Sequence, residues 1–273
     1  MMDPVLERVV RHLSGGGRLW LFLDYDGTLA DFAPTPDTIV QDKALVSLFV
    51  RLALYPETLR VVIMSGRRLS HIEKLLPVPG ILRAGTYGIE YMTWEGERLN
   101  LLDFETERPF LDQVKAAWQG LVEGQPGIYL EDKGFALAIH GKDAPENVFR
   151  KIRTEAAQAA AEVVGKGVFR VQGGNKFLEV APVIADKGQS VSTLLKRFPW
   201  PNADIVYIGD DDKDEAGFKA VKTAGGVGIL VTAEKEPRQT QADHCLENPQ
   251  QVRAWLEELA SQLLVIAGSQ LAR

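Results

Sequence analysis

The sequence predicts an α/β fold: a parallel sheet covered by helices, with a smaller α+β domain inserted into it. Three observations predict this. Short apolar runs alternate with helical patterns before residue 107, and the same alternation returns after Pro182. The apolar runs lead into polar or acidic residues, which is typical of buried parallel strands. Between them, residues 107–181 follow the order helix, strand, strand, helix, strand, strand.

Residues 1–106 are predicted to form the first part of the core domain. Apolar residues recur at helical spacing from Pro4 to Leu13, and a run of glycines ends this helix. The continuous apolar run Leu19–Leu23 predicts a buried strand. Further elements follow in the same rhythm: a helix over 43–53, a strand over 59–64, a helix that ends at 76 and a strand over 81–84.

Residues 107–181 are predicted to form the inserted domain. Its helices are expected over 108–122 and 145–164. Two hairpins complete it, with strands over 128–132 and 135–140 around Lys133-Gly134, and over 168–172 and 176–180 around Gly173-Gly174. The order αββαββ predicts an open-faced sheet with helices on one side.

Residues 182–273 are predicted to complete the core domain. Helices are expected over 187–198, 214–222 and 249–264, and strands over 205–208 and 226–231. From about Ala267 the tail is expected to fray.

Composition and charge narrow the classes of partner. The formal net charge is -6, which argues against a nucleic-acid partner because phosphate backbones require clustered Lys and Arg. An anionic small substrate is compatible with it, since a site can be locally positive in an acidic protein. The N-terminus lacks a signal-peptide pattern, and no apolar run approaches the roughly 18 residues of a membrane span. Cys245 is the only cysteine, so no internal disulfide can form, and we expect a cytoplasmic protein with no membrane partner.

Acidic residues follow two of the predicted strands. Asp24 and Asp26 follow the first, and the strand that ends at 208 leads into Asp210, Asp211, Asp212 and Asp214. Ligands of parallel α/β sheets bind beyond the carboxyl ends of the strands, so both groups can surround one point. Crowded carboxylates repel one another unless a cation neutralises them, and an all-oxygen ligand set favours Mg²⁺. For the second group alone, a solvated acidic turn is an equal alternative.

Asp24 is the candidate nucleophile for phosphoryl transfer. A carboxylate can attack phosphorus and form an acyl phosphate, which splits one difficult step into two easier ones. Asp26 is placed to exchange protons with the leaving oxygen and then with the attacking water. Gly27 allows a sharp turn beside a ligand. Thr28 can hydrogen-bond the phosphate, or it can simply cap the following turn.

Two further segments can hold the phosphoryl group. Ser65-Gly66-Arg67 lies between a predicted strand and a helix, where a hydroxyl and free backbone N–H groups can bind phosphate oxygens. Lys187 opens a helix and can supply positive charge beside the aspartates. Each has a plain alternative, an N-cap serine without a ligand and a solvated lysine.

Other phosphatase chemistries lack their residues. A cysteine-based phosphatase needs an Arg six positions after its Cys, but Gln251 stands at that spacing from Cys245. The histidines are scattered, with no metal-ligand or Arg-His-Gly spacing, and no P-loop lysine motif occurs.

Four motifs, in order, resemble those of the haloacid dehalogenase superfamily. They are Asp24-Tyr25-Asp26-Gly27-Thr28-Leu29, Ser65-Gly66-Arg67, Asp186-Lys187-Gly188 and Gly209-Asp210-Asp211-Asp212-Lys213-Asp214-Glu215. Within the superfamily, the first and last motifs and the αββαββ insertion are similar to those of trehalose-6-phosphate phosphatases. The resemblance covers roughly residues 19–256. It implies a Rossmann-like core with a cap domain, and a Mg²⁺-dependent phosphatase that works through an aspartyl phosphate.

The resemblance also implies roles for single residues. Asp24 is the nucleophile and a Mg²⁺ ligand, and Asp26 is the general acid/base that binds Mg²⁺ through its backbone carbonyl. The other metal positions are Asp210, with Asp211 and Asp214 in support. Ser65 and Lys187 hold the phosphoryl group. In the inserted domain, residues that fall where the family binds sugar hydroxyls are Glu131, Lys133 and Glu179; paired surface charges are the plain alternative.

Three segments depart from the family pattern where the sugar is read. Gly85-Thr86-Tyr87-Gly88 replaces Gly-Asn/Ser-His-Gly, His140-Gly141-Lys142 replaces His-Tyr-Arg, and Ala181 replaces the arginine of Glu-Val-Arg-Pro. Tyr87 can still stack on a sugar and donate a hydrogen bond, whereas Ala181 cannot replace an arginine. The departures leave the phosphoryl chemistry untouched and the identity of the sugar open.

Three hypotheses follow. In the first, the substrate is trehalose 6-phosphate, with a functional link to a trehalose-6-phosphate synthase. In the second, it is another glycosyl phosphate, such as sucrose 6-phosphate or glucosylglycerol phosphate. In the third, the protein is a non-catalytic sugar-phosphate sensor or synthase partner, against which the intact Asp24, Asp26, Lys187 and Asp210 argue. We expect a monomer.

Overall fold

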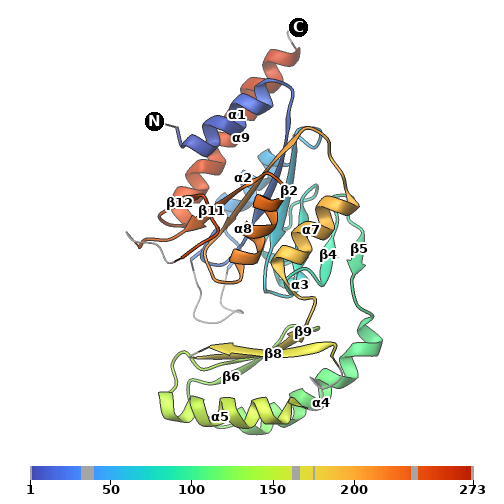
Figure 1. The fold of residues 1–273 in the computed structure, drawn as a ribbon, viewed down its shortest axis with the longest axis vertical. Helices are drawn as coiled ribbons and strands as arrows, with labels where there is room; N and C mark the ends of the chain where they lie inside the picture. The colour runs from blue at the N-terminus through green and yellow to red at the C-terminus, as the bar shows by residue number, and fades with distance from the viewer. Residues whose placement is uncertain (1, 32–39, 162–166, 175, 235–238, 272–273) are drawn as a thin grey trace. The chain divides into compact units, whose positions relative to one another are not determined.

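The chain forms two compact units (Figure 1). The computed structural model describes residues 2–31, 40–161, 167–174, 176–234 and 239–271. The core unit consists of Met1–Leu99 and Asp186–Arg273, and the insert unit consists of Asn100–Ala185. The predicted inserted domain, residues 107–181, falls inside the second of these ranges.

The core unit is built on an eight-stranded sheet in the order β12-β11-β10-β1-β2-β3-β4-β5. From β12 to β3 neighbouring strands are parallel, and β4 is antiparallel to β3. The predicted α/β class with a parallel-sheet core is therefore confirmed. The strands are β1 (Arg18–Leu23), β2 (Leu59–Met64), β3 (Leu82–Gly85), β4 (Glu90–Met92), β5 (Arg98–Asn100), β10 (Ala203–Gly209), β11 (Val227–Val231) and β12 (His244–Leu246). The apolar pattern does not predict β4, β5 or β12, since a strand of three residues is too short to show its alternation.

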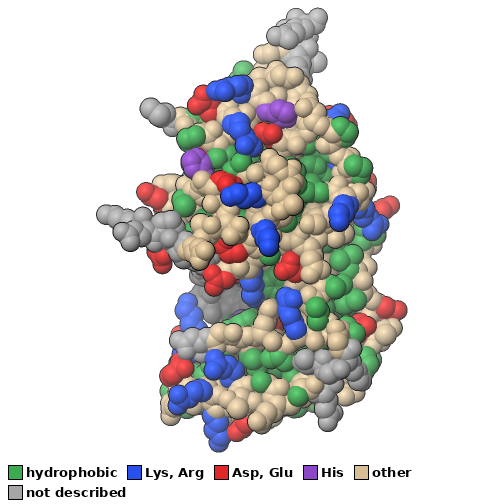
Figure 2. All heavy atoms as spheres, in the orientation of Figure 1, with side chains coloured by type: hydrophobic (Ala, Val, Ile, Leu, Met, Phe, Trp, Pro, Cys, Tyr) green, Lys and Arg blue, Asp and Glu red, His purple; other side chains and the backbone are tan. Residues whose placement is uncertain are grey.

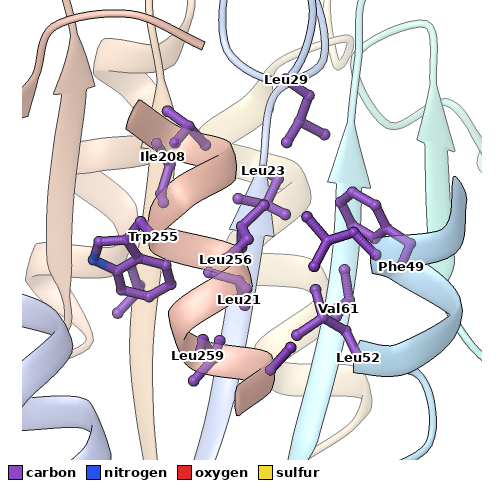
Figure 3. Packing of buried hydrophobic residues seen from close by; sticks show 14 of the residues in the cluster. Leu21, Leu23, Leu29, Phe49, Leu52, Val61, Ile208, Trp255, Leu256 and Leu259 are labelled. Atoms are coloured by element: carbon purple, nitrogen blue, oxygen red, sulfur yellow. The ribbon is translucent and has the colours of Figure 1, made fainter. Parts of the chain in front are cut away.

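Side chains that alternate along β1 fill two apolar clusters, one on each face of the sheet. Leu21 and Leu23 pack with residues of α2 and α9, including Leu52 and Leu256 (Figure 3). On the other face, Phe22 lies in a cluster with residues of α7 and α8. Helices of the core unit are α1 (Pro4–Ser14), α2 (Lys43–Leu52), α3 (Leu69–Leu75), α7 (Lys187–Arg197), α8 (Asp214–Thr223) and α9 (Pro249–Leu271). The tail that is expected to fray from about Ala267 is helical in the structure as far as Leu271.

The described part of the insert unit has a four-stranded antiparallel sheet in the order β6-β7-β9-β8, with its two described helices on one face (Figure 1). Trp118 is fully buried between the helices, where its Nε1 donates to the carbonyl oxygen of Ala156 at 2.8 Å. The elements are α4 (Phe104–Val122), β6 (Tyr129–Asp132), β7 (Leu137–His140), α5 (Glu146–Ala159), β8 (Phe169–Gly174) and β9 (Phe177–Pro182), which reproduces the order αββαββ.

The main differences between the predicted and the observed boundaries of the insert unit lie at both helices and at the second hairpin. Helix α4 begins at Phe104 instead of Arg108, because the Asp103 side chain accepts hydrogen bonds from the first free backbone N–H groups of the helix. Helix α5 ends at Ala159, and residues 162–166 of the predicted helix lie outside the described residues. Gly173 and Gly174 do not form the turn of the second hairpin, since both pair with residues of β9.

The face of the molecule shown in Figure 2 carries both signs of charge. On the face in Figure 2, the coloured Lys and Arg side chains are interspersed with Asp and Glu and form no continuous basic stripe. Within the described ranges, every helix is too short or too polar to cross a bilayer.

Candidate active site

Parallel strands of the core unit bring three of the predicted motifs to one edge of the sheet. In the register of the sheet, Leu23 at the end of β1 pairs with Ile208 of β10 and Ile63 of β2. Asp24 therefore follows β1 beside the end of β10, and its backbone N–H donates to the Ile208 carbonyl at 2.9 Å. Ser65 follows β2 at the same edge. This arrangement is the strand-end site expected of a parallel α/β sheet.

A triad of carboxylates lies at this edge. Carboxylate oxygens of Asp24, Asp210 and Asp214 lie within 4.8 Å of one another, and Asp24 and Asp214 are buried. Asp214, the first residue of α8, accepts hydrogen bonds from the backbone N–H groups of Asp210 and Asp211, each at 3.1 Å. The Tyr207 hydroxyl donates to Asp214 Oδ1 at 2.6 Å. The last acidic motif is therefore folded around Asp214 and presents Asp210 toward Asp24.

Lys187 is the cation of the cluster. It is the first residue of α7, which begins after the N-cap Asp186, and its side chain is 3% exposed. Its Nζ lies 2.7 Å from Asp24 Oδ1 and 2.6 Å from Asp214 Oδ1. The plain alternative of a solvated lysine is thereby ruled out.

Burial and like charge dominate the electrostatics of the triad. Burial raises the pKa of Asp24 well above its ordinary value, the Lys187 charge opposes this, and Asp214 and Asp210 add to it. Burial and the charges of Asp214 and Asp211 raise the pKa of Asp210 to about 7. Burial alone would lower the pKa of Lys187, but the negative charges of Asp214 and Asp24 raise it well above its ordinary value. One ammonium thus faces more than one buried carboxylate, and the all-oxygen set fits a hard divalent cation.

Asp26 and Arg67 form a second charged pair. Arg67 Nε lies 2.6 Å from Asp26 Oδ2, and Nη2 lies 2.7 Å from Oδ1, so the carboxylate is held by a two-pronged contact. The Arg67 side chain is 9% exposed and that of Asp26 is 22% exposed. The structure therefore places Arg67 on the Asp26 carboxylate, a contact that the sequence did not indicate because the two residues stand 41 positions apart.

Two predicted site residues frame the triad. Thr28 is fully buried, and its hydroxyl donates to Asp210 Oδ1 at 3.4 Å. The Asp211 carboxylate accepts from the backbone N–H groups of Lys213 and Asp214 at 2.8 and 3.1 Å, which caps the start of α8. Neither Asp211 nor the side chain of Asp26 joins the carboxylate triad.

The loop after β3 packs against the Ser65-Gly66-Arg67 segment. The Ser65 hydroxyl accepts from the Arg67 backbone N–H at 3.1 Å, and the Tyr87 backbone N–H donates to the Ser65 carbonyl at 2.9 Å. A Cβ at Gly66 would lie 2.6 Å from the Tyr87 ring, so the segment requires glycine there. Tyr87 is 6% exposed, its hydroxyl bonds Lys213 Nζ, and that nitrogen lies 4.4 Å from the ring centre. Its ring therefore covers Gly66.

In the insert unit, the three predicted residues converge on one charged cluster. Lys133 Nζ lies 2.7 Å from Glu179 Oε1 and 3.8 Å from Glu131 Oε2. Two further residues complete it. His140 Nε2 lies 2.8 Å from Glu131 Oε2, and Gln172, which the sequence did not single out, donates from Nε2 to Glu179 Oε2 at 2.9 Å. Glu179 is fully buried and Lys133 is 6% exposed, so the alternative of paired surface charges is wrong.

Gln172 and Tyr207 are the partners of site residues that sequence reasoning missed, for different reasons. Gln172 pairs directly with Glu179 in the β8–β9 register, and the hairpin pattern alone could have suggested this neighbour. Tyr207 carries no such signal, because an aromatic residue inside an apolar strand reads as core. The contact of its hydroxyl with Asp214 becomes evident only when the three-dimensional positions of β10 and α8 are known.

Comparisons with known proteins identify the family of the chain. The trehalose-phosphatase family model matches residues 22–250. Trehalose-phosphate phosphatase B of Arabidopsis thaliana is 33% identical over 264 residues, which cover 89% of this chain and 67% of the relative. Trehalose-phosphate phosphatase of Mycobacterium ulcerans is 32% identical over 248 residues, which cover 89% of this chain and 62% of the relative. The chain thus spans about two thirds of the length of these relatives.

Solved structures confirm the fold. The C-terminal domain of a trehalose-6-phosphate phosphatase from C. albicans has a TM-score of 0.75 at 22% identity, and the match covers 95% of this chain and 98% of that one. The C-terminal domain of a Candida albicans trehalose synthase regulatory protein has a TM-score of 0.72 at 14% identity, over 94% and 99%. A haloacid dehalogenase-like hydrolase from Bacteroides thetaiotaomicron has a TM-score of 0.56 at 17% identity, over 89% and 99%. Proteins of different description share this fold, so it does not by itself establish activity.

The family model spans most of the chain and includes all four motifs of the core unit. Its members are phosphoric monoester hydrolases, which confirms the enzyme class predicted from the sequence. The chain belongs to the trehalose-phosphatase family.

Proposed function

We propose that this chain is a Mg²⁺-dependent phosphatase that converts trehalose 6-phosphate to trehalose and phosphate through an aspartyl phosphate on Asp24. The observation that carries the proposal is the buried triad of Asp24, Asp210 and Asp214 with Lys187 bound to two of its members. A sensor needs to bind a sugar phosphate, but it has no need of a buried nucleophile whose ionised form depends on a neighbouring cation.

The chemistry has two steps on the same phosphorus. In the first, an Asp24 carboxylate oxygen attacks phosphorus, the bond from phosphorus to the sugar oxygen breaks, and that oxygen takes a proton from Asp26. In the second, water gives a proton to Asp26 and attacks phosphorus, which releases phosphate and restores the Asp24 carboxylate. Asp26 therefore acts first as an acid and then as a base.

Neighbouring residues prepare Asp24 and Asp26 for these roles. Lys187, at 2.7 Å, stabilises the charged form of Asp24 against the effect of burial and offers positive charge to the phosphoryl oxygens. The two-pronged contact from Arg67 fixes the direction of the Asp26 carboxylate. We assign Arg67 to this positioning role in addition to the phosphate contact expected of its motif.

Hydroxyl and backbone groups complete the phosphoryl site. Candidates are the Thr28 and Ser65 hydroxyls and the Gly66 backbone N–H, which lie on the loops after β1 and β2. Asp24, Asp210 and Asp214, with the Asp26 carbonyl and support from Asp211, would hold the Mg²⁺, which when bound neutralises the carboxylates and polarises a phosphoryl oxygen.

For the sugar, we propose contacts from the charged cluster of the insert unit. Glu131 and Glu179 offer acceptor oxygens and Lys133 offers donors, which is the combination that sugar hydroxyls require. We also propose that Tyr87, on the loop after β3, contacts the substrate, although its ring is largely buried against Gly66. A cytoplasmic location and a link to a trehalose-6-phosphate synthase remain part of the proposal.

A panel of sugar phosphates with and without Mg²⁺ tests the function. Phosphate release from trehalose 6-phosphate should exceed that from glucose 6-phosphate, sucrose 6-phosphate and glucosylglycerol phosphate, and EDTA should abolish it. Faster release from sucrose 6-phosphate or glucosylglycerol phosphate would move the substrate to that glycosyl phosphate. Absence of Mg²⁺-dependent release from every member would support the non-catalytic sensor.

A further inference from the structure

Arg83 is a buried cation outside the candidate active site. It lies in β3 and is 7% exposed. Its Nη1 donates to the Leu76 carbonyl at 2.9 Å, while its Nε is buried and has no hydrogen-bond partner among the described residues. Among the described residues, no carboxylate lies within 4.0 Å of its guanidinium. The Nε–H group of this side chain is thus unpaired in the described part of the chain, while Nη1 is paired.

A buried guanidinium in this condition is costly. Removing an arginine from water requires compensation by a counter-charge or by hydrogen bonds to most of its donors. The nearby Glu73 is occupied, since its Oε2 lies 2.5 Å from Arg98 Nη2. Burial lowers the pKa of Arg83, and Arg98 adds to this while Glu73 opposes it. The single contact to the Leu76 carbonyl, beyond the end of α3, compensates the charge only in part.

A pocket of about 370 Å³ opens onto Arg83. Its walls mix apolar and polar surface. They come from the 77–80 segment before β3 and from the segment between β4 and β5, which contributes Trp94. The Trp94 indole N–H donates to the Val61 carbonyl at 3.3 Å, so this wall is fixed to the neighbouring strand. Glu73 and the exposed Glu95 also line the pocket. The pocket therefore combines one buried cation with apolar residues such as Trp94 and with acidic residues.

We propose that this pocket binds a small organic molecule with one carboxylate and an apolar body. Arg83 lines the pocket, and its positive charge would attract the carboxylate and donate a charged hydrogen bond to it. The apolar residues of the walls suit a ring or short aliphatic group, and the volume suits a molecule of a few to a dozen heavy atoms. Glu73 and Glu95 disfavour a dianion such as inorganic phosphate, so the site is distinct in its chemistry from the phosphoryl site.

Benzoate, benzamide and inorganic phosphate are suitable probes, because benzamide matches benzoate in shape but lacks its charge. Each is titrated into the full-length ¹⁵N-labelled protein, and the Arg83 Nε–H and Trp94 indole signals are followed by NMR. Benzoate should shift both signals saturably, and benzamide and phosphate should not. No saturable shift with benzoate, an equal response to benzamide, or a response to phosphate alone would overturn the proposal.

Variants separate ligand binding from a purely structural role of Arg83. Arg83→Met should weaken benzoate binding by about tenfold or more, because the charged hydrogen bonds are lost. Arg11→Met is the matched control, since it removes a surface arginine that is 77% exposed and should leave the affinity unchanged. Retention of full affinity in Arg83→Met would refute the site. The comparison of benzoate with benzamide in the wild-type protein decides the question even if Arg83→Met does not fold.

Discussion

Replacement of Lys187 by methionine tests the charge balance of the buried cluster. Methionine keeps most of the side-chain volume but removes the ammonium that lies 2.7 Å from Asp24 and 2.6 Å from Asp214. Both carboxylates are less than a tenth exposed, so they would be left buried without this cation. Breaking a buried ion pair in this way costs about 3–5 kcal/mol in free energy of unfolding. We expect the lower end, about 3 kcal/mol, since a carboxylate can take up a proton instead of remaining charged.

The assay is denaturant unfolding of the metal-free protein near pH 7, followed by circular dichroism. Lys219→Met is the matched control, because Lys219 is an exposed lysine on α8 and its loss should change the free energy of unfolding by less than about 0.5 kcal/mol. The deficit of Lys187→Met should shrink at lower pH, where the carboxylates of the variant become protonated. A variant as stable as the wild-type protein at pH 7 would refute the claim that Lys187 neutralises the cluster.

Three further predictions concern the metal, the acid/base residue and the sugar. Because the pKa of Asp210 is raised to about 7, the metal-free protein should lose stability as pH rises from about 4 to 7. Mg²⁺ should therefore raise the melting temperature more at pH 7.5 than at pH 5.5. An equal effect of Mg²⁺ at both pH values would contradict this prediction. Arg67→Met should lower kcat by about tenfold or more with little change in KM, since Asp26 loses its two-pronged contact, whereas an unchanged kcat would exclude the positioning role. Glu179→Gln should lower kcat/KM for trehalose 6-phosphate more than for p-nitrophenyl phosphate, which has no sugar; equal losses would indicate a purely structural cluster.

The phosphoryl site could be predicted from the sequence because each of its main residues directly follows a recognisable strand. Asp24, Ser65 and Asp210 each follow an apolar run at the end of a parallel strand, and parallel register carries such ends to one edge. The role of Lys187 in the site was harder to predict, since a lysine at a helix start is usually solvated. Its burial between two aspartates depends on the packing of α7 against the strand ends, which no local pattern encodes.

What could not be predicted depends on contacts between distant segments. The contact of Arg67 with Asp26 joins two loops, and the packing of Tyr87 on Gly66 depends on the loop after β3. In that loop Thr86 and Tyr87 both have positive φ, at 48° and 56°, which their side chains disfavour and which no sequence signal announced. The prediction of a hairpin turn at Gly173-Gly174 was wrong, because glycine suggests a turn even at positions where strand pairing continues.

The covalent role of Asp24 is the central claim, and it can be tested directly. The protein is mixed with Mg²⁺ and trehalose 6-phosphate, quenched in acid during turnover, and reduced with borohydride, which converts an aspartyl phosphate to homoserine. Mass spectrometry of the peptides should find homoserine at position 24 only in the sample that received substrate, and Asp24→Asn should release no phosphate. Homoserine at another aspartate, or an Asp24→Asn protein with near-normal turnover, would contradict the account.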